Sequence, residues 1–279
     1  RTRRGEVFIV ENPYLLGGKL PRFSRFASGL HTILGLAYYQ GALYCAQRTE
    51  LTKLVDEDQD GQADIYETVV SWPSSGHYHE YSFGPKVGPK GEMYVTTNVS
   101  FVNPEWWRGV STVPWRGWTL KIDPLAGTYL PYATGMRSPC GIGMIDGQFF
   151  YADNQGDWMG SGGLVQLEEG DFAGHPAGLA WADQPSSPVK LRMNDIFYRV
   201  SPRFSRPGGP MVKPENIEDE KTQTLAQLAQ ELPGIKTPAV WLPHSILGIS
   251  TSEIISDTTG GSFGPFHGQI FIGDQGQSK

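Results

Sequence analysis

Gly41-Ala-Leu-Tyr-Cys-Ala46 shows the pattern that decides the fold, a glycine followed by a short apolar or aromatic run. The pattern returns at Gly5-Glu-Val-Phe-Ile-Val10, Gly91-Glu-Met-Tyr-Val-Thr96, Gly147-Gln-Phe-Phe-Tyr-Ala152 and Gly268-Gln-Ile-Phe-Ile-Gly273. A second apolar run precedes three of the copies, at residues 34–38, 82–85 and 140–144. Two such runs, rich in β-branched and aromatic residues and joined by a glycine-containing turn, predict a β-hairpin.

The spacing of the repeat indicates how the hairpins are arranged. The five glycines stand at positions 5, 41, 91, 147 and 268, which are 36, 50, 56 and 121 residues apart. Intervals of this size in an all-β sequence favour a β-propeller with blades of about four strands each. A β-sandwich is the alternative, but sandwiches do not usually repeat one hairpin motif at such spacing. The last interval is long enough to hold a further blade or a long insertion.

We predict a single β-propeller domain over residues 1–279 with a short helical insertion. Residues 183–236 form the insertion or long connection, because part of this segment is rich in Pro, Gly and Arg and has no strand pattern. Within it, residues 221–232 predict a helix, since three leucines fall on one face and a Pro-Gly pair follows. A propeller closes its ring, so we expect further strands beyond the two ends of this sequence.

Composition and charge disfavour several classes of function for this sequence. The 23 Lys and Arg residues are balanced by 29 Asp and Glu residues, and no basic face stands out, so nucleic acid is not a predicted partner. No apolar run approaches the roughly 20 residues that span a bilayer. The two cysteines, Cys45 and Cys140, are either one disulfide or two thiols, and we favour unpaired structural thiols.

Residues 56–67 read Asp-Glu-Asp-Gln-Asp-Gly-Gln-Ala-Asp-Ile-Tyr-Glu, the ligand spacing of an EF-hand-type calcium loop. The predicted ligands are Asp56, Asp58, Asp60, Gln62, Asp64 and Glu67. Carboxylates and a backbone carbonyl are the hard oxygen ligands that calcium prefers. Strands are predicted on both sides of the loop, which favours a structural calcium site over a helix-loop-helix switch. An acidic, solvated turn without a metal is the alternative.

Several segments, in their order along the chain, carry a resemblance to a known family. They are Arg48-Thr-Glu-Leu-Thr-Lys-Leu54 with the acidic loop, Tyr78-His-Glu-Tyr-Ser-Phe-Gly-Pro85, Gly135-Met-Arg-Ser-Pro-Cys-Gly141, Asp153-Asn-Gln-Gly-Asp-Trp158 and Gly174-His-Pro-Ala-Gly178, followed by the C-terminal copy of the repeat. The set resembles the membrane-bound dehydrogenase-like propeller domains, which are related to soluble glucose and sorbosone dehydrogenases dependent on pyrroloquinoline quinone (PQQ). The resemblance implies six blades, a periplasmic or extracellular location, and a c-type cytochrome domain or protein as partner.

The same resemblance implies a cofactor site. Arg137 matches the quinone-contacting arginine of the relatives, and a guanidinium is well suited to bind the carboxylates of PQQ. The residues Asp153, Asn154, Gln155 and Asp157 are predicted to help line this site. Ser138 and Cys140 stand where the relatives have Asn and Gln, and the relatives' Gly-Pro pair is missing at residues 155–156. These departures put cofactor binding in doubt.

His79 is the candidate catalytic base. It precedes Glu80, so it is interpreted either as a base with an orienting carboxylate or as a hydrogen-bonded histidine at the start of a strand. His175 precedes Pro176 and is interpreted as a turn residue.

Two main functions follow from these observations. The first is a calcium-dependent quinoprotein dehydrogenase acting on a sugar or polyol, with PQQ as cofactor. The alternative is a non-catalytic, calcium-stabilised propeller that serves as a binding or assembly module, because a fold does not by itself carry an activity. A lactonase-type hydrolase with a central calcium is a third hypothesis, although no nucleophile arrangement is evident.

Overall fold

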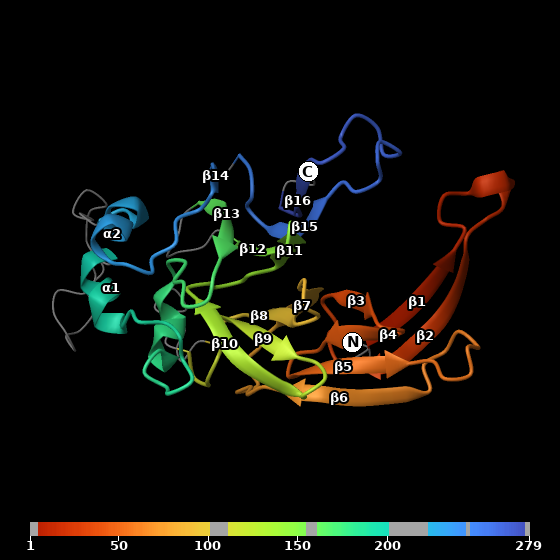
Figure 1. The fold of residues 1–279 in the computed structure, drawn as a ribbon, viewed down its shortest axis with the longest axis horizontal. Coiled ribbons are helices and arrows are strands. Elements are labelled where there is room, and N and C mark those ends of the chain that lie inside the picture. The colour runs from red at the N-terminus through yellow and green to blue at the C-terminus, as the bar shows by residue number, and fades with distance from the viewer. Residues whose placement is uncertain (1–4, 101–110, 155–160, 201–222, 244–245, 277–279) are drawn as a thin grey trace.

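The computed structural model describes residues 5–100, 111–154, 161–200, 223–243 and 246–276. Its strands form three four-stranded antiparallel sheets and two two-stranded sheets (Figure 1). The first four-stranded sheet comprises β3 (Leu36–Tyr39), β4 (Ala42–Ala46), β5 (Glu50–Val55) and β6 (Ile65–Ser71). The second comprises β7 (Ser82–Val87), β8 (Met93–Thr97), β9 (Trp118–Asp123) and β10 (Thr128–Thr134). The third comprises β11 (Gly141–Ile145), β12 (Gln148–Ala152), β13 (Gly162–Leu167) and β14 (Val240–Leu242).

Two hairpins complete the sheet structure of the described residues. One comprises β1 (Gly5–Glu11) and β2 (Arg22–Leu30), and the other comprises β15 (Thr251–Ser256) and β16 (Ile270–Asp274). The helical elements are two 3-10 turns, η1 (Leu16–Gly18) and η3 (Pro176–Trp181), and two α-helices, α1 (Met193–Val200) and α2 (Leu225–Glu231).

The sheets are arranged as the blades of a propeller. Within each four-stranded sheet the strands are neighbours in chain order, so each blade is a simple meander. The first strands β3, β7, β11 and β15 contact one another in turn, which places them on the inner side of successive blades. The all-β propeller predicted from the repeated hairpins is therefore confirmed.

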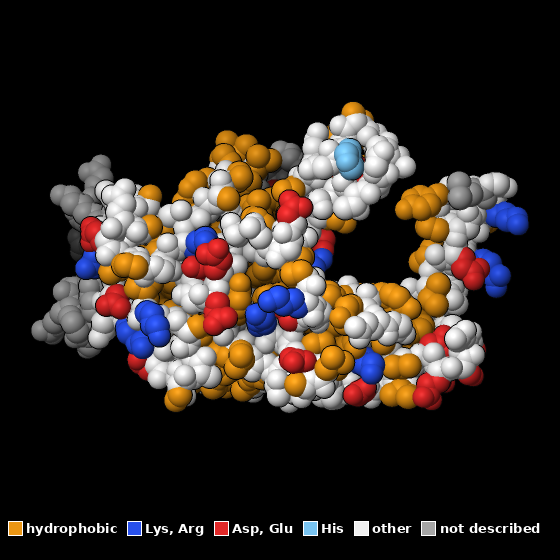
Figure 2. Space-filling model, viewed as in Figure 1, with side chains coloured by type: hydrophobic (Ala, Val, Ile, Leu, Met, Phe, Trp, Pro, Cys, Tyr) orange, Lys and Arg blue, Asp and Glu red, His pale blue; other side chains and the backbone are white. Residues whose placement is uncertain are grey.

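Four of the five repeat copies form the second strand of an inner hairpin, as predicted. They are β4, β8, β12 and β16, and each pairs antiparallel with the strand before it. The copy at Gly5 differs, because it forms β1 and pairs with the strand after it. The β1–β2 hairpin extends from the rest of the molecule as an arm (Figure 1). Its tip and outer part expose large apolar side chains such as Phe8, Val10 and Phe23 (Figure 2).

The long interval between the last two repeat copies contains an insertion within a blade. β13 and β14 pair with each other although residues 168–239 separate them, and η3, α1 and α2 lie in that connection. The predicted helix is present as α2, where Thr224 and Gln227 form a capping box that fixes its first turn. Helix α1 was not predicted. Residues 201–222 of this connection, which include its part rich in Pro, Gly and Arg, lie outside the described residues.

The hydrophobic core lies between successive blades. Met93, Leu120 and Ile122 of the second blade pack with Leu51 of the first blade, and Leu228 of α2 joins the same cluster. A second cluster joins the second and third blades. Side chains along a strand alternate between the two faces of a blade. A blade that lies between two others therefore contributes side chains to the core on both of its faces. The insertion therefore packs onto the propeller core and does not form a core of its own among the described residues.

Two glycines let the inner strands of the third and fourth blades approach closely. A Cβ added to Gly141 would lie 2.3 Å from the carbonyl oxygen of Ser252, and one added to Gly143 would lie 2.8 Å from Cβ of Ile254. Both distances are shorter than real Cβ contacts, so β11 can reach this position against β15 only with glycine at these places.

Candidate functional site

Chain segments that follow or precede strands of two blades meet, together with η3, at one end of the propeller. His79 lies just before β7, Ser138 follows β10, Asp153 follows β12, and His175 begins η3. Arg137, His175, Asp153 and Asn154 help to line a cavity of about 20 Å³ at this place. A cavity of that size has room for about one water molecule.

Hydrogen bonds fix the ring of His79 on both sides. Its Nδ1 lies 3.0 Å from the carbonyl oxygen of Val99, and its Nε2 lies 2.9 Å from Oγ of Ser138. A carbonyl oxygen only accepts, so Nδ1 carries the proton. Burial, helped by the positive charge of Arg137, lowers the pKa of His79 to about 4, although the hydrogen bond to the Val99 carbonyl acts in the opposite direction. The ring is therefore neutral near pH 7, and Nε2 presents its lone pair to a hydroxyl group.

Asp153 organises the turn that carries Arg137 and Ser138. Its carboxylate accepts from the backbone N–H of Arg137 at 2.6 Å and from that of Ser138 at 2.7 Å. Burial raises the pKa of Asp153 to about 6, although these two hydrogen bonds and the charge of Arg137 act in the opposite direction. Asp153 thus holds the 137–138 backbone in place, and Ser138 in turn contacts His79.

His175 is a site residue that the sequence interpretation assigned to a turn. Its side chain is 2% exposed, and its Nδ1 accepts from the backbone N–H of Ala177 at 3.3 Å, so it does cap the 3-10 turn η3. Burial, followed by the charges of Arg137 and His79, lowers its pKa to about 3. Nothing in the Gly-His-Pro segment indicates that His175 lines a cavity. The residue reaches the cavity only through the fold of the chain around η3.

Two charged side chains, the partly buried Arg48 and the buried Glu80, hold the segment that carries His79. Arg48 donates from Nε to the carbonyl oxygen of Glu80 at 2.8 Å and from Nη2 to that of His77 at 2.7 Å. The carboxylate of Glu80, which is fully buried, accepts from Ser74 Oγ and Ser75 Oγ, each at 2.6 Å. Burial acts to raise the pKa of Glu80, but these hydrogen bonds outweigh it and the pKa is lowered.

One of the two interpretations of His79, a base oriented by the carboxylate of Glu80, does not agree with the structure. The Nδ1 of His79 is oriented by the carbonyl of Val99, and the carboxylate of Glu80 faces Ser74, Ser75 and the N–H of Gly76 instead. His79 and Glu80 lie in a turn, in which the backbone N–H of Glu80 donates to the carbonyl oxygen of His77 at 3.1 Å, and the carboxylate of Glu80 is held by residues 74–76. Of the predicted cofactor residues, Gln155 and Asp157 lie outside the described residues.

The histidines predict a pH dependence of stability. Their lowered pKa values mean that below pH 6.5 the unfolded chain binds protons that the folded chain does not, so stability falls as the pH falls from 6.5 toward 4. Between pH 7 and pH 5 each of His79 and His175 should cost about 2 kcal/mol. The raised pKa of Asp153 acts in the opposite sense below about pH 6.

We therefore expect the free energy of unfolding to drop by about 2–3 kcal/mol between pH 7 and pH 5 on account of these three groups. In His175→Gln the drop should be smaller by about 2 kcal/mol, because glutamine does not titrate. Urea unfolding at the two pH values measures both quantities. An identical drop in wild type and variant would show that His175 is not held neutral in the folded protein.

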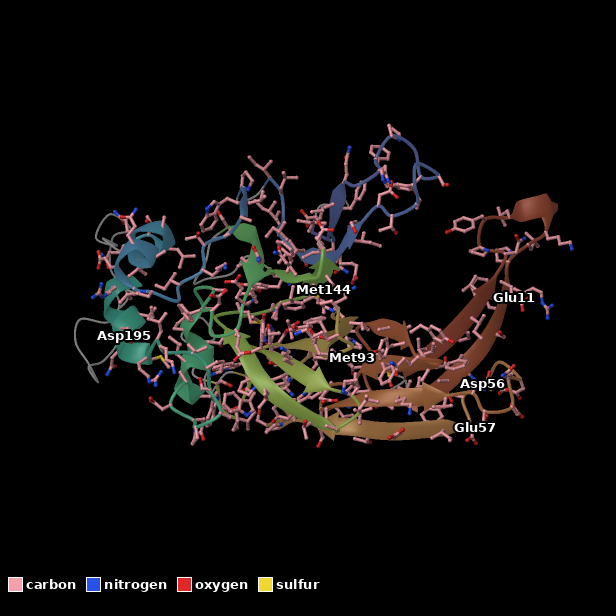
Figure 3. The ribbon with its side chains drawn as sticks, viewed as in Figure 1. Glu11, Asp56, Glu57, Met93, Met144 and Asp195 are labelled. Atoms are coloured by element: carbon pink, nitrogen blue, oxygen red, sulfur yellow. The ribbon has the colours of Figure 1, made fainter. Side chains whose placement is uncertain are left out.

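The acidic loop between β5 and β6 brings together part of the predicted calcium ligand set. Carboxylate oxygens of Asp56, Asp58 and Asp64 lie within 4.8 Å of one another. The carboxylate of Asp60 accepts from the backbone N–H of Gln62 at 2.8 Å. Three converging carboxylates are a donor set that suits calcium, which completes its six to eight oxygens with carbonyls and water. Figure 3 shows Asp56 at the base of the β1–β2 arm.

Glu67 does not join the three carboxylates. It lies on β6 and its Oε2 is 3.1 Å from Nζ of Lys53, its cross-strand partner on β5. In an EF-hand the twelfth position belongs to a helix that returns to the loop, whereas here a strand begins at Ile65 and carries Glu67 away along the sheet. The flanking strands are confirmed, and the ligand roles of the six residues stay a prediction.

The calcium loop yields a direct test. We expect millimolar calcium to raise the melting temperature of the protein by roughly 5 °C, because a ligand that binds only the folded state stabilises it. Asp58→Asn should lose most of this rise, since it removes one of the three converging carboxylates. The control is Glu57→Gln, which changes an acidic neighbour outside the trio. Differential scanning fluorimetry, with calcium and with a chelator, measures these melting temperatures. An equal calcium-dependent rise in Asp58→Asn and in the wild type would disprove the site.

Both cysteines are free thiols, as predicted. Cys45 is buried in the first blade, and burial raises its pKa to about 12. Burial also raises the pKa of Cys140, which lies two residues after Ser138 in the sequence. Neither group is therefore a thiolate near pH 7.

Comparison with known proteins supports the fold. No protein-family model matches the chain, and no curated protein matches it. Two solved structures of glucose dehydrogenases match with TM-scores of 0.52 and 0.51, each at 13% identity. The matches cover 88% and 90% of this chain, and 66% and 67% of those structures. The chain shares the propeller-type fold of these dehydrogenases.

A third solved structure that matches is the soluble aldose sugar dehydrogenase from Escherichia coli in its apo form, with a TM-score of 0.47 at 11% identity. That match covers 85% of this chain and 59% of that structure. The chain spans about half to two thirds of the length of these solved proteins and of two others that it matches. Among the described residues, no helix is long and apolar enough to cross a membrane.

Proposed function

We propose that the chain is the propeller of a quinoprotein-type dehydrogenase that oxidises a hydroxyl group of a sugar or polyol. The proposal treats residues 1–279 as one domain, placed in the periplasm or outside the cell, with PQQ as cofactor and a c-type cytochrome as electron acceptor. The observation that carries it is His79, which is neutral, fixed through Nδ1, and directs Nε2 at a hydroxyl group. The propeller fold shared with glucose dehydrogenases supports it.

The residues at the cavity suit one end of an anionic cofactor. Arg137 supplies a guanidinium, and its charge already acts on both His79 and His175. Guanidinium groups bind carboxylates in a bidentate manner, and PQQ carries carboxylates. The cavity of about 20 Å³ has room for about one water molecule, so the side chains that line it would have to move apart to admit a carboxylate group. Arg137, with Asp153 holding its backbone, would therefore bind one carboxylate of the cofactor.

His79 would act as the general base. When bound, PQQ supplies the acceptor for a hydride from the carbon that carries the substrate hydroxyl. Nε2 of His79 takes the hydroxyl proton, and the hydrogen bond from Nδ1–H to the Val99 carbonyl stabilises the imidazolium that results. A carboxylate bound at Arg137 would offset the positive charge that lowers the pKa of His79, so cofactor binding would make the base stronger. In this proposal the substrate hydroxyl would take the position beside Nε2 that the hydroxyl of Ser138 holds at 2.9 Å.

The second candidate function is a binding or assembly module. The substitution of Ser138 and Cys140 for the relatives' residues and the small cavity both favour it. Its polar cluster would then serve only to fix the loops at this end of the propeller.

A screen for turnover separates the two functions. The full chain, loaded with calcium and PQQ, is incubated with aldoses and polyols and an artificial electron-acceptor dye. The dehydrogenase proposal expects dye reduction that depends on PQQ and on at least one substrate. No reduction with any substrate, together with no binding of PQQ, would leave the module as the function.

A further inference from the structure

A second cleft lies at the opposite ends of the strands from His79. It has a volume of about 480 Å³ and is formed by the β7–β8 turn and the β9–β10 hairpin, with Tyr39 and Glu169 at its sides. Strand β8 connects the two places, because Glu92 before it lines the cleft and Asn98 after it donates to Ser138 in the site at 3.2 Å. Cavities of about 300–1,000 Å³ accommodate small organic ligands. The proposed dehydrogenase reaction makes no use of this cleft.

Aromatic rings form part of the cleft, and one of them is held firmly. Tyr132 packs edge-on against Tyr94 with ring centroids 5.2 Å apart, and its hydroxyl donates to the carbonyl oxygen of Leu167 at 3.3 Å. Tyr129, on the same strand, is half-buried and packs against the core between the first two blades. A ring that is fixed before binding offers contact area at little cost in conformational entropy.

Tyr39 brings a third ring from the first blade, and Gly91 makes room for it. A Cβ on Gly91 would lie 2.2 Å from Oη of Tyr39, and the φ of Gly91 is +87°. Glycine is therefore required here both for the backbone conformation and for the approach of the ring. The hydroxyl of Tyr39 accepts from Nε2 of Gln40 at 3.0 Å. The cleft thus combines aromatic side chains from two blades.

The charged groups of the cleft are of both signs. Lys90 and Lys121 contribute amines, while Glu92, Asp123 and Glu169 contribute carboxylates. Neither lysine forms an ion pair with any residue in the described part of the chain. Nζ of Lys121 lies 5.8 Å above the ring of Tyr132. The cleft therefore presents donors, acceptors and apolar ring faces, with three carboxylates against two amines, which disfavours phosphates and other strongly anionic ligands.

We propose that this cleft binds a neutral oligosaccharide at a site separate from the one at His79. A sugar ring has an apolar C–H face that packs on an aromatic ring, and hydroxyls at its rim that both donate and accept. Tyr39, Tyr129 and Tyr132 supply the rings, Lys90 and Lys121 supply donors, and the carboxylates supply acceptors. The inference stands whether or not the chain oxidises sugars, because it rests on different residues.

Calorimetric titration of the full, calcium-loaded chain tests this site. The probes are four neutral tetrasaccharides, built of glucose with β-1,4 links, glucose with α-1,4 links, xylose and mannose, and one acidic one, tetragalacturonate. At least one neutral probe should bind, and both Tyr129→Leu and Lys121→Met should weaken its binding at least fivefold. The matched controls are Tyr38→Leu, a 74% exposed tyrosine next to Tyr39 in sequence, and Lys53→Met on the first blade. Both controls should bind within twofold of wild type.

Three results would overturn the proposal. They are no binding of any neutral probe, tighter binding of tetragalacturonate than of every neutral probe, and equal binding by the wild type and the Lys121→Met variant. Lys121→Met keeps the aliphatic stem, so it tests the site even if Tyr129→Leu does not fold, which circular dichroism would show. His79→Gln should keep the affinity for the neutral probe. If it loses that affinity, the saccharide binds at the first site, and the separate cleft is disproved while the dehydrogenase proposal is not.

Discussion

Arg116→Met is expected to lower the free energy of unfolding by about 3–5 kcal/mol, because it removes one partner of a buried ionic network. Arg116 is fully buried, and its guanidinium donates to the carbonyl oxygens of Arg48 at 2.9 Å, Pro73 at 3.1 Å and Tyr81 at 3.1 Å. These carbonyls belong to three separate segments of the chain. The guanidinium therefore joins the first blade, the loop after β6 and the segment that leads into β7.

The expected loss of stability is large because the variant still contains the buried carboxylate of Glu80. Its carboxylate is also fully buried, and the charge of Arg116 helps to lower its pKa. Methionine fills similar space, but it removes the positive charge near the Glu80 carboxylate and the guanidinium donor shared by three carbonyl oxygens. Urea unfolding in the presence of calcium measures the change. The control is Arg22→Met, whose side chain is 84% exposed and should change stability by less than about 0.5 kcal/mol. A loss below about 1 kcal/mol for Arg116→Met would mean that the network does not hold the loop.

His79→Gln is expected to lower kcat of the proposed dehydrogenase by about 10²–10⁴ fold, the usual contribution of a positioned general base. Glutamine is similar in size and can still donate to the Val99 carbonyl, but it offers no lone pair of comparable basicity. KM and the affinity for PQQ should change little, because the proposed cofactor contact is Arg137. Steady-state kinetics by dye reduction give both constants, over a pH range that includes the titration of the base.

Ser138→Ala provides the matched control for this variant. It removes the hydroxyl at 2.9 Å from Nε2 of His79 and leaves the ring and its bond to Val99 in place. If Ser138 only stands in for the substrate hydroxyl, kcat should fall by much less than in His79→Gln. Equal losses in the two variants would mean that His79 acts through Ser138, and a His79→Gln variant with wild-type kcat would remove His79 from the reaction.

The parts of the fold that sequence predicts well are those set by local pattern. The hairpins β3–β4, β7–β8 and β11–β12 follow from apolar runs around a glycine, and the two strands flanking the acidic loop follow in the same way. A tight turn joins most of these pairs, so register and partner are fixed within a few residues. The order of the inner strands around the propeller then follows from the chain order.

Contacts between residues far apart in the chain could not be predicted. β14 pairs with β13 across residues 168–239, and no pattern in its three residues indicates that partner. His175 and Arg116 each look like ordinary turn or loop residues, and their roles arise only from carbonyls and side chains of distant segments. The interpretation in which Glu80 orients His79, one of two that the sequence left open, fails for the same reason, because adjacency in sequence is a poor guide to which side chains meet.

The most direct test of the proposed function is a calorimetric titration of PQQ into the calcium-loaded full chain, repeated with Arg137→Ala. The control is Arg22→Ala, an exposed arginine on the β1–β2 arm. The proposal predicts saturable binding by wild type and by the control, and a loss of at least tenfold in affinity with Arg137→Ala, in line with the removal of a charge-assisted contact. No binding by the wild type, while calcium still raises its melting temperature, would contradict the quinoprotein account and identify a calcium-stabilised module.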